Sequence, residues 1–159
     1  MAEQVEKGLR DPNPPSDSIY TKFPINVKQK VSVVAGSYTD STQLKQLANA
    51  DVFFFKWIFN DNKDTSCSKI LAGLYQIMKP TAKIIICEVV YNYNRNEWKF
   101  TTTLDLIMCL LFNSKERSTN DWIQLLSKGE GYQFNVSFAD CTISKQIWEM
   151  KLITLTKIM

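Results

Sequence analysis

The chain has 159 residues, of which 45% are hydrophobic and 22% charged, as expected for one folded domain with a buried core. Its 19 basic and 16 acidic side chains leave a net charge of +3, which is too small and too dispersed to indicate binding to nucleic acid or to an anionic membrane. Because the chain has no histidine, a Ser-His-Asp or Cys-His nucleophile, a histidine base and a histidine metal site are excluded.

The N-terminal sequence and the cysteines indicate a compartment. Residues 1–15 contain no apolar signal core, and no stretch approaches the roughly 18 apolar residues of a membrane span, so we expect a cytoplasmic protein. The four cysteines are far apart, without a CxxC pair, and we expect reduced, mostly buried thiols and no metal site. They are Cys67, Cys87, Cys109 and Cys141.

The proline content and the apolar pattern of the first 50 residues change near residue 30. Residues 1–30 contain four of the five prolines and little apolar periodicity, so we expect an irregular tail or cover there and a folded domain over 31–159. The run VSVVAG at 31–36 predicts a buried strand that enters a turn. Residues 41–49 predict a short helix with an N-cap at Ser41.

Two further apolar runs, DVFFFKWI at 51–58 and KIIICEVV at 83–90, predict buried strands. Apolar residues at helical spacing between them predict a helix that ends before Pro80. The candidates for its N-cap are the turn 60–62, Asp64 and Thr65. Strands that alternate with helices predict a parallel sheet with crossover helices, in which sites form at the carboxyl ends of the strands.

The last third of the chain changes pattern again. A helix over 101–112 precedes a second helix, which we expect to begin at Ser118 with a capping box to Asp121. Alternating apolar residues in 132–140 and 147–158 then predict antiparallel strands at one side of the sheet. The fold class predicted from the pattern is therefore α/β with an antiparallel C-terminal hairpin.

Four segments occur in an order typical of a known family: KWIFNDN (56–62), KPTAK (79–83), IIICE (84–88) and KERS (115–118). On these motifs, residues from about 30 to 159 resemble the C-terminal part of the plant and fungal type of S-adenosylmethionine-dependent O-methyltransferases. The resemblance implies an incomplete Rossmann-like class I methyltransferase sheet with crossover helices. It also implies methyl transfer from S-adenosylmethionine to the hydroxyl of a small molecule.

The resemblance implies roles for four residues near the acceptor. Asn60 stands where the family has the histidine that removes the hydroxyl proton, Asp61 follows it, and Glu88 and Glu116 match the two acidic residues that flank the histidine. A neutral amide does not accept a proton near neutral pH, so we expect the loss of a general-base effect that is typically worth about 10²- to 10⁴-fold. Asp61 replaces the base only if burial raises its pKa.

By the same resemblance, Ser37, Tyr38 and Lys56 match positions that contact the cofactor, and Met108 matches a residue that lines the substrate pocket. The glycine-rich turn and the ribose-binding acidic residue of the family have no counterpart in the sequence. We therefore expect a truncated methyltransferase that is weak or inactive.

Simpler interpretations stay open for several of these residues. Lys56 and Glu88 also fit solvated residues at the ends of strands. Glu116 also fits a favourable charge before a helix, and Met108 also fits a core residue. The strand at 31–35 has three possible places: beside 51–56, outside the sheet, or against another chain. A non-enzymatic module that forms a homodimer or binds a full-length relative is therefore a second hypothesis, and a gene fragment without a selected role is a third.

Overall fold

The computed structural model describes residues 36–91, 98–141 and 150–158 of the chain. The tail expected over 1–30, the strand expected over 31–35 and the beginning of the last expected strand at 147–149 lie outside the described residues.

The described elements follow one another in this order: α3 (Ser41–Leu44), the 3-10 helix η2 (Lys45–Leu47), β1 (Val52–Lys56), α4 (Asp64–Ile77), β2 (Lys83–Tyr91), α5 (Trp98–Phe112), β3 (Arg117–Ser118), α6 (Thr119–Ser127), β4 (Lys128–Gly129), β5 (Tyr132–Asp140) and β6 (Met150–Lys157).

The sheet has the strand order β1-β2-β6-β5-β4. β1 and β2 run parallel, with α4 as the crossover between them, whereas β2 pairs with β6 and β6 with β5 in antiparallel fashion. β3 pairs with β2 at Val90 and Tyr91, beyond the part of β2 that β1 covers. The predicted α/β class, the parallel strands and the antiparallel C-terminal pair are thus confirmed.

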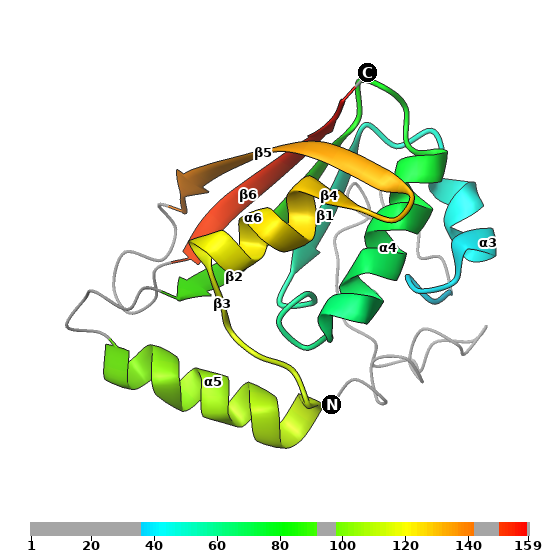
Figure 1. Ribbon diagram of the computed structural model, residues 1–159. Coiled ribbons are helices and arrows are strands. Elements are labelled where there is room, and N and C mark those ends of the chain that lie inside the picture. Colours follow the sequence, from blue (N-terminus) through cyan, green and yellow to red (C-terminus); the bar gives the residue numbers. More distant parts are fainter. Residues whose placement is uncertain (1–35, 92–97, 142–149, 159) are drawn as a thin grey trace, which may run out of the picture.

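α4 and α6 pack on the same face of the sheet, and α5 lies apart from them near one end of the sheet (Figure 1). Ile84 and Ile86 point from β2 into the main core, which includes buried residues of α4 and α6. Cys87, on the opposite face of β2, belongs to a second cluster with Leu104 of α5. Since α5 lies near the carboxyl end of β2, the second cluster sits beside the sheet edge where sites form in such folds.

The helix starts confirm one expected cap and correct two. Ser118 and Asp121 form the predicted capping box of α6. The N-cap of α3 is Asp40, whose carboxylate accepts from the backbone N–H of Thr42, so the expected cap at Ser41 is wrong. α4 begins after Lys63 without a side-chain cap, so none of the three candidates caps it.

β1 is only half buried, which corrects the expectation of a buried strand. Phe53 is buried, whereas Val52 is 50% exposed and Phe54 59% exposed on the other face. Within the described ranges β1 is the last strand at its end of the sheet. Its residues alternate because only one of its faces packs on the core.

No helix in the described part of the chain is both long enough and apolar enough to cross a membrane.

Candidate functional site

The turn after β1 is built around the carboxylate of Glu88. Trp57 has a φ of 57°, an uncommon left-handed conformation for a bulky residue, and it bends the chain away from the direction of β1. The backbone N–H groups of Ile58 and Phe59 consequently point at Glu88 on the neighbouring strand, and both donate to its Oε1 atom at 3.0 Å. Glu88 thus connects the end of β2 to the turn in which the expected catalytic position lies.

Asn60, the residue at the position of the family's base, is buried in this turn with 1% of its surface exposed. Its side chain lies close enough to Glu116 to lower the pKa of that carboxyl, yet neither its Nδ2 nor its Oδ1 atom completes a hydrogen bond to a described residue. The structure therefore brings together Asn60, Glu88 and Glu116 from three separate segments, as the resemblance implied.

Burial controls the acidity of both glutamates. Desolvation raises the pKa of Glu88 to about 8, although the N–H groups of the turn, which stabilise the ionised form, oppose the rise. Desolvation also raises the pKa of Glu116 to about 7, and the neighbouring Asp105 carboxylate contributes in the same direction. The solvated strand end is thus the wrong interpretation of Glu88, and Glu116 is buried rather than a surface charge before a helix.

Asp61 and Asp105 lie at the outer side of this cluster. Partial burial raises the pKa of Asp61, in the direction that a substitute base requires. Asp105, on α5, accepts the backbone N–H of Glu116 at 2.8 Å and so fixes the segment that carries this glutamate. Sequence reasoning missed Asp105, because one aspartate on a helix carries no signal of the loop that it contacts.

Arg117 holds the segments of the site together. Its side chain is 1% exposed, and its guanidinium donates to the carbonyls of Phe59 and Asn62, both at 2.7 Å, and to the Asp64 carboxylate at 2.7 and 2.9 Å. The same group lies 5.2 Å from the ring centroid of Trp122 on α6. One cation thereby joins the turn after β1, the start of α4 and α6.

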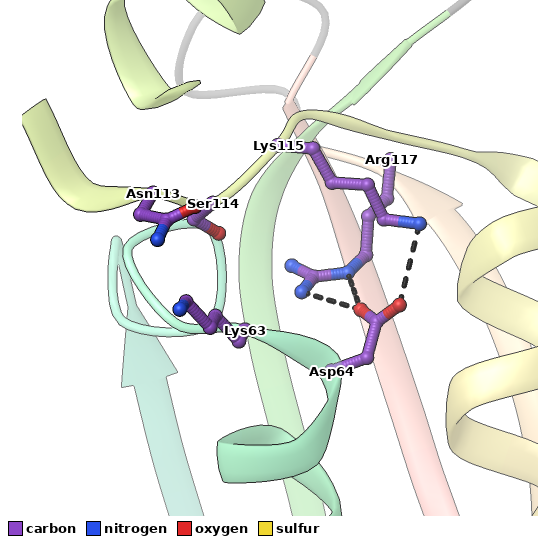
Figure 2. A pocket seen from close by; sticks show the side chains of 6 residues that line it. All are labelled: Lys63, Asp64, Asn113, Ser114, Lys115 and Arg117. Atoms are coloured by element: carbon purple, nitrogen blue, oxygen red, sulfur yellow. Dashed lines mark hydrogen bonds and ion pairs between the residues drawn. The ribbon is translucent and has the colours of Figure 1, made fainter. Parts of the chain in front are cut away.

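Asp64 is the shared anion of this region. Burial alone would raise its pKa, but hydrogen bonds and charge from Arg117 and Lys115 hold the pKa of this carboxyl below its usual value. Figure 2 shows both cations directed at Asp64. Asp64 is the first residue of α4 and the N-cap position is Lys63, so Asp64 is not placed to cap the helix, although its charge is favourable in the first turn.

A hollow of about 300 Å³ lies beside this ion pair and is lined by the residues in Figure 2. Asn113, at its wall, ends α5 with a φ of 51°, and its backbone N–H donates to the carbonyl of Cys109 at 3.1 Å. Asparagine tolerates this left-handed conformation and so serves at a helix end where glycine is more usual.

Met108 is 7% exposed, which agrees with a core residue and leaves its substrate role untested.

The three residues matched to cofactor contacts are spread over two places. Ser37 and Tyr38 lie in the turn before α3, where the Ser37 hydroxyl is hydrogen-bonded to Thr39 and Tyr38 is 37% exposed. Lys56 is exposed at the end of β1. Together these residues offer a hydroxyl, a ring and an ammonium group but no carboxylate for ribose hydroxyls, so they fit S-adenosylmethionine incompletely.

The described residues contain no group of three or more histidine, cysteine or acidic side chains that could hold a metal ion.

Comparisons with known proteins agree on one family. The model of the O-methyltransferase domain family matches residues 18–133. O-methyltransferase 12 of Dictyostelium discoideum is 30% identical over 125 residues, which are 79% of this chain and 31% of that protein. The chain thus spans about a third of the length of this curated relative.

Solved structures share the fold at low sequence identity. The human N-acetylserotonin methyltransferase in complex with SAM superimposes with a TM-score of 0.68 at 21% identity, over 87% of this chain and 36% of that one. A structure described as a pericyclic reaction enzyme also matches, with a TM-score of 0.62 at 18% identity, over 87% of this chain and 38% of the other. The same fold therefore supports more than one reaction class.

Arg117→Met should destabilise the protein strongly. The substitution removes the charged donor to the carbonyls of Phe59 and Asn62 and leaves Asp64 with Lys115 alone. We therefore expect a loss of about 3 kcal/mol in the free energy of unfolding. Urea unfolding followed by circular dichroism measures the change. Lys115→Met is the control, since its half-exposed ion pair should contribute less than about 1 kcal/mol. Equal losses in the two variants would contradict the central role of Arg117.

Glu88 should make the protein less stable as pH rises. Its folded pKa of about 8 lies above the ordinary value of 4.5, so between these values the folded state holds a proton that the unfolded chain has released. Stability from this group is then full below about pH 4.5 and declines as pH rises to about 8. Glu88→Gln should flatten the decline by about 1 kcal/mol or more, measured by urea unfolding at pH 5.5 and pH 8.5.

The exposed Glu130 provides the matched control for this measurement. Glu130→Gln should leave the pH dependence of stability unchanged. A Glu88→Gln protein with the same pH dependence as the unsubstituted chain would show that Glu88 ionises normally.

Proposed function

Since this chain belongs to the O-methyltransferase family, we propose that its described part supplies the acceptor side of a methyl-transfer site and that the chain alone is a weak or inactive methyltransferase. The observation that carries the proposal is Asn60, buried between Glu88 and Glu116 at the position of the family's base. The proposed acceptor is a small-molecule hydroxyl, the proposed donor S-adenosylmethionine, and the proposed compartment the cytoplasm.

The chemistry requires proton removal from the acceptor. S-adenosylmethionine supplies an electrophilic methyl group when it is bound, and a phenol-like hydroxyl with a pKa near 10 must lose its proton to attack it well. Asn60 can orient such a hydroxyl through its amide but cannot take the proton. Glu116, with a pKa of about 7, is a stronger base than an ordinary carboxylate, yet it is largely protonated below neutral pH. These groups support at most a slow methyl transfer whose rate increases with pH.

The cofactor side supports the same proposal. Among the described residues, Ser37, Tyr38 and Lys56 are the matched contacts, and no acidic residue is matched to the ribose. When ribose hydroxyls leave water and find no hydrogen-bond partner in the protein, they lose hydrogen bonds, and the binding of S-adenosylmethionine becomes weaker. We therefore propose that affinity for S-adenosylmethionine is low in this chain.

An interaction module is the second candidate, and the exposed residues of β1 favour it. Val52 and Phe54 project from the last described strand of the sheet, and such an edge can pair with another chain. A second copy, or a longer relative, would bury both side chains. This proposal requires neither a base nor a methyl donor.

Asn60→His should restore methyl transfer where donor binding permits it. An imidazole between two carboxyls is a base suited to neutral pH, so with millimolar S-adenosylmethionine we expect the rate toward an ordinary phenol to rise about 10²-fold or more. Toward an acidic phenol that is already ionised at pH 8, the variant and the unsubstituted chain should react equally. Transfer of radiolabelled methyl groups measures both rates.

Asn62→His, in the same turn, is the matched control and should not change either rate. Calorimetric titration of the unsubstituted chain with S-adenosylmethionine accompanies the assay and should detect no binding of micromolar affinity. Micromolar binding, or rapid transfer to the ordinary phenol by the unsubstituted chain, would overturn the proposal of a weak or inactive enzyme.

The interaction module makes a separate prediction. If β1 pairs with a second copy, size exclusion with light scattering should detect a dimer, and Phe54→Lys should shift it toward monomer because a charge on the buried face opposes pairing. Ile123→Lys, at a residue of α6 that is 42% exposed, is the control and should leave the dimer intact. A strictly monomeric unsubstituted protein at high concentration would count against self-association.

A further inference from the structure

The hollow in Figure 2 is lined by more positive than negative side chains. Lys63, Lys115 and Arg117 lie at its wall, whereas Asp64 is the one acidic residue among its described lining residues. The charge of Asp64 is already compensated, because Arg117 binds its Oδ1 atom and Lys115 lies 3.3 Å from its Oδ2 atom. The hollow of about 300 Å³ therefore has a positive potential that favours an anion.

Several donors at the hollow are not used by the described part of the chain. The ammonium group of Lys63 forms no ion pair with a described residue, and the side-chain amide of Asn113 forms no hydrogen bond with one. Lys115 has three N–H groups, and its two carboxylate neighbours, Asp64 at 3.3 Å and Asp121 at 4.0 Å, leave at least one of them available. Two segments of the chain thus bring unused donors to one hollow.

The loop that carries Asn113 is held in place by its own hydrogen bonds. The backbone N–H of Asn113 donates to the carbonyl of Cys109 at 3.1 Å, and that of Ser114 donates to the carbonyl of Met108 at 3.2 Å. The Ser114 hydroxyl donates to the carbonyl of Asn62, in the turn before α4, at 2.9 Å. A wall that is already fixed loses little conformational freedom when a ligand binds, and this favours affinity.

The charge and the size of the hollow limit the class of anion. Three cations against one carboxylate leave an excess of two positive charges, of which a carboxylate ligand would compensate one. A phosphate ester carries a charge of about −1.5 to −2 near neutral pH and offers three acceptor oxygens. Lysine is a common partner of phosphate in proteins. About 300 Å³ also leaves room for a small organic group joined to the phosphate.

We propose that Lys63, Asn113 and Lys115 form a binding site for the phosphate group of a small molecule. The two ammonium groups and the amide donate to the phosphate oxygens, while Arg117 stays bound to Asp64. Inorganic phosphate and a small phosphate ester share this chemistry, and the experiment distinguishes them. The site contains none of the residues matched to the acceptor or to S-adenosylmethionine, so the inference goes beyond the proposed function and does not rest on it.

Binding at this site should also stabilise the fold. Lys63 and Asn113 are distant in the sequence and meet at the hollow only in the folded chain. A ligand that binds the folded state alone raises the melting temperature as its concentration rises above the Kd. Because Lys63 and Lys115 are exposed to solvent, salt should screen their charges, and binding should weaken at 0.5 M sodium chloride.

The experiment uses the full chain at pH 7.5 and low salt, with phenyl phosphate as the probe and without a methyl donor. Calorimetric titration measures the affinity, and NMR follows the side-chain amide of Asn113, whose signal is assigned from its absence in Asn113→Gly. We expect a Kd of about 1 mM or tighter and a shift of that signal. Benzoate, which carries one charge, and phenol, which is neutral, should bind at least tenfold more weakly.

Lys63→Gln and Lys69→Gln form the matched pair of variants. Both lysines are exposed, one directly before α4 and one within it, but only Lys63 lines the hollow. Lys63→Gln should weaken the binding of phenyl phosphate about tenfold and abolish most of the rise in melting temperature, whereas Lys69→Gln should change neither. Asn113→Gly should weaken binding about threefold, because glycine keeps the left-handed helix end and removes the amide.

The NMR spectrum of each variant establishes that it is folded. Unchanged affinity in Lys63→Gln, equal binding of benzoate, or no shift of the Asn113 signal would overturn the proposal. Comparison with inorganic phosphate identifies the source of the phosphate group. Tighter binding of phenyl phosphate would support an ester as the ligand, and tighter binding of inorganic phosphate would support the free anion at the same site. No methyl donor is present, so these results are independent of the methyl-transfer assay.

Discussion

The buried guanidinium of Arg117 is the interaction on which the arrangement of the site depends. The turn after β1, the start of α4 and the loop before α6 are far apart in the sequence, and the cation meets the carbonyls of Phe59 and Asn62 and the carboxylate of Asp64 from one place. A buried guanidinium is tolerated only when its N–H groups have hydrogen-bond partners, so the carbonyls and the carboxylate can occupy few other positions around it. Glu116 precedes Arg117 directly and is placed with it.

A second constraint follows from the first. With Arg117 used for structure, the cluster of Asn60, Glu88 and Glu116 has no cation of its own among the described residues, and burial leaves both glutamates with raised pKa values. In the family pattern a histidine stands at position 60 and can carry the compensating charge. Asparagine cannot, so the substitution affects the electrostatics of the whole cluster as well as the removal of a proton. The missing base at position 60 and the missing compensating charge in the cluster have this single origin.

Much of the fold could be predicted from local patterns. The helical spacing before Pro80 identified α4, the Ser118–Asp121 pair identified the start of α6, and alternation identified the two antiparallel strands. The failures have tertiary causes. The expected cap at Asp64 failed because this residue already belongs to the first turn of α4, where Arg117 holds its carboxylate. The expected burial of the first strand failed because only one of its faces packs on the core.

The sequence by itself determined the order of the elements, the absence of histidine and the identity of the residue at position 60. The motif order was also sufficient to bring Asn60, Glu88 and Glu116 into one hypothesis. Only the tertiary structure decided that these three side chains are buried together, that Asp105 fixes Glu116, and that Arg117 is a structural cation. Desolvation and hydrogen-bond partners arise from residues distant along the chain, and no local pattern contains them.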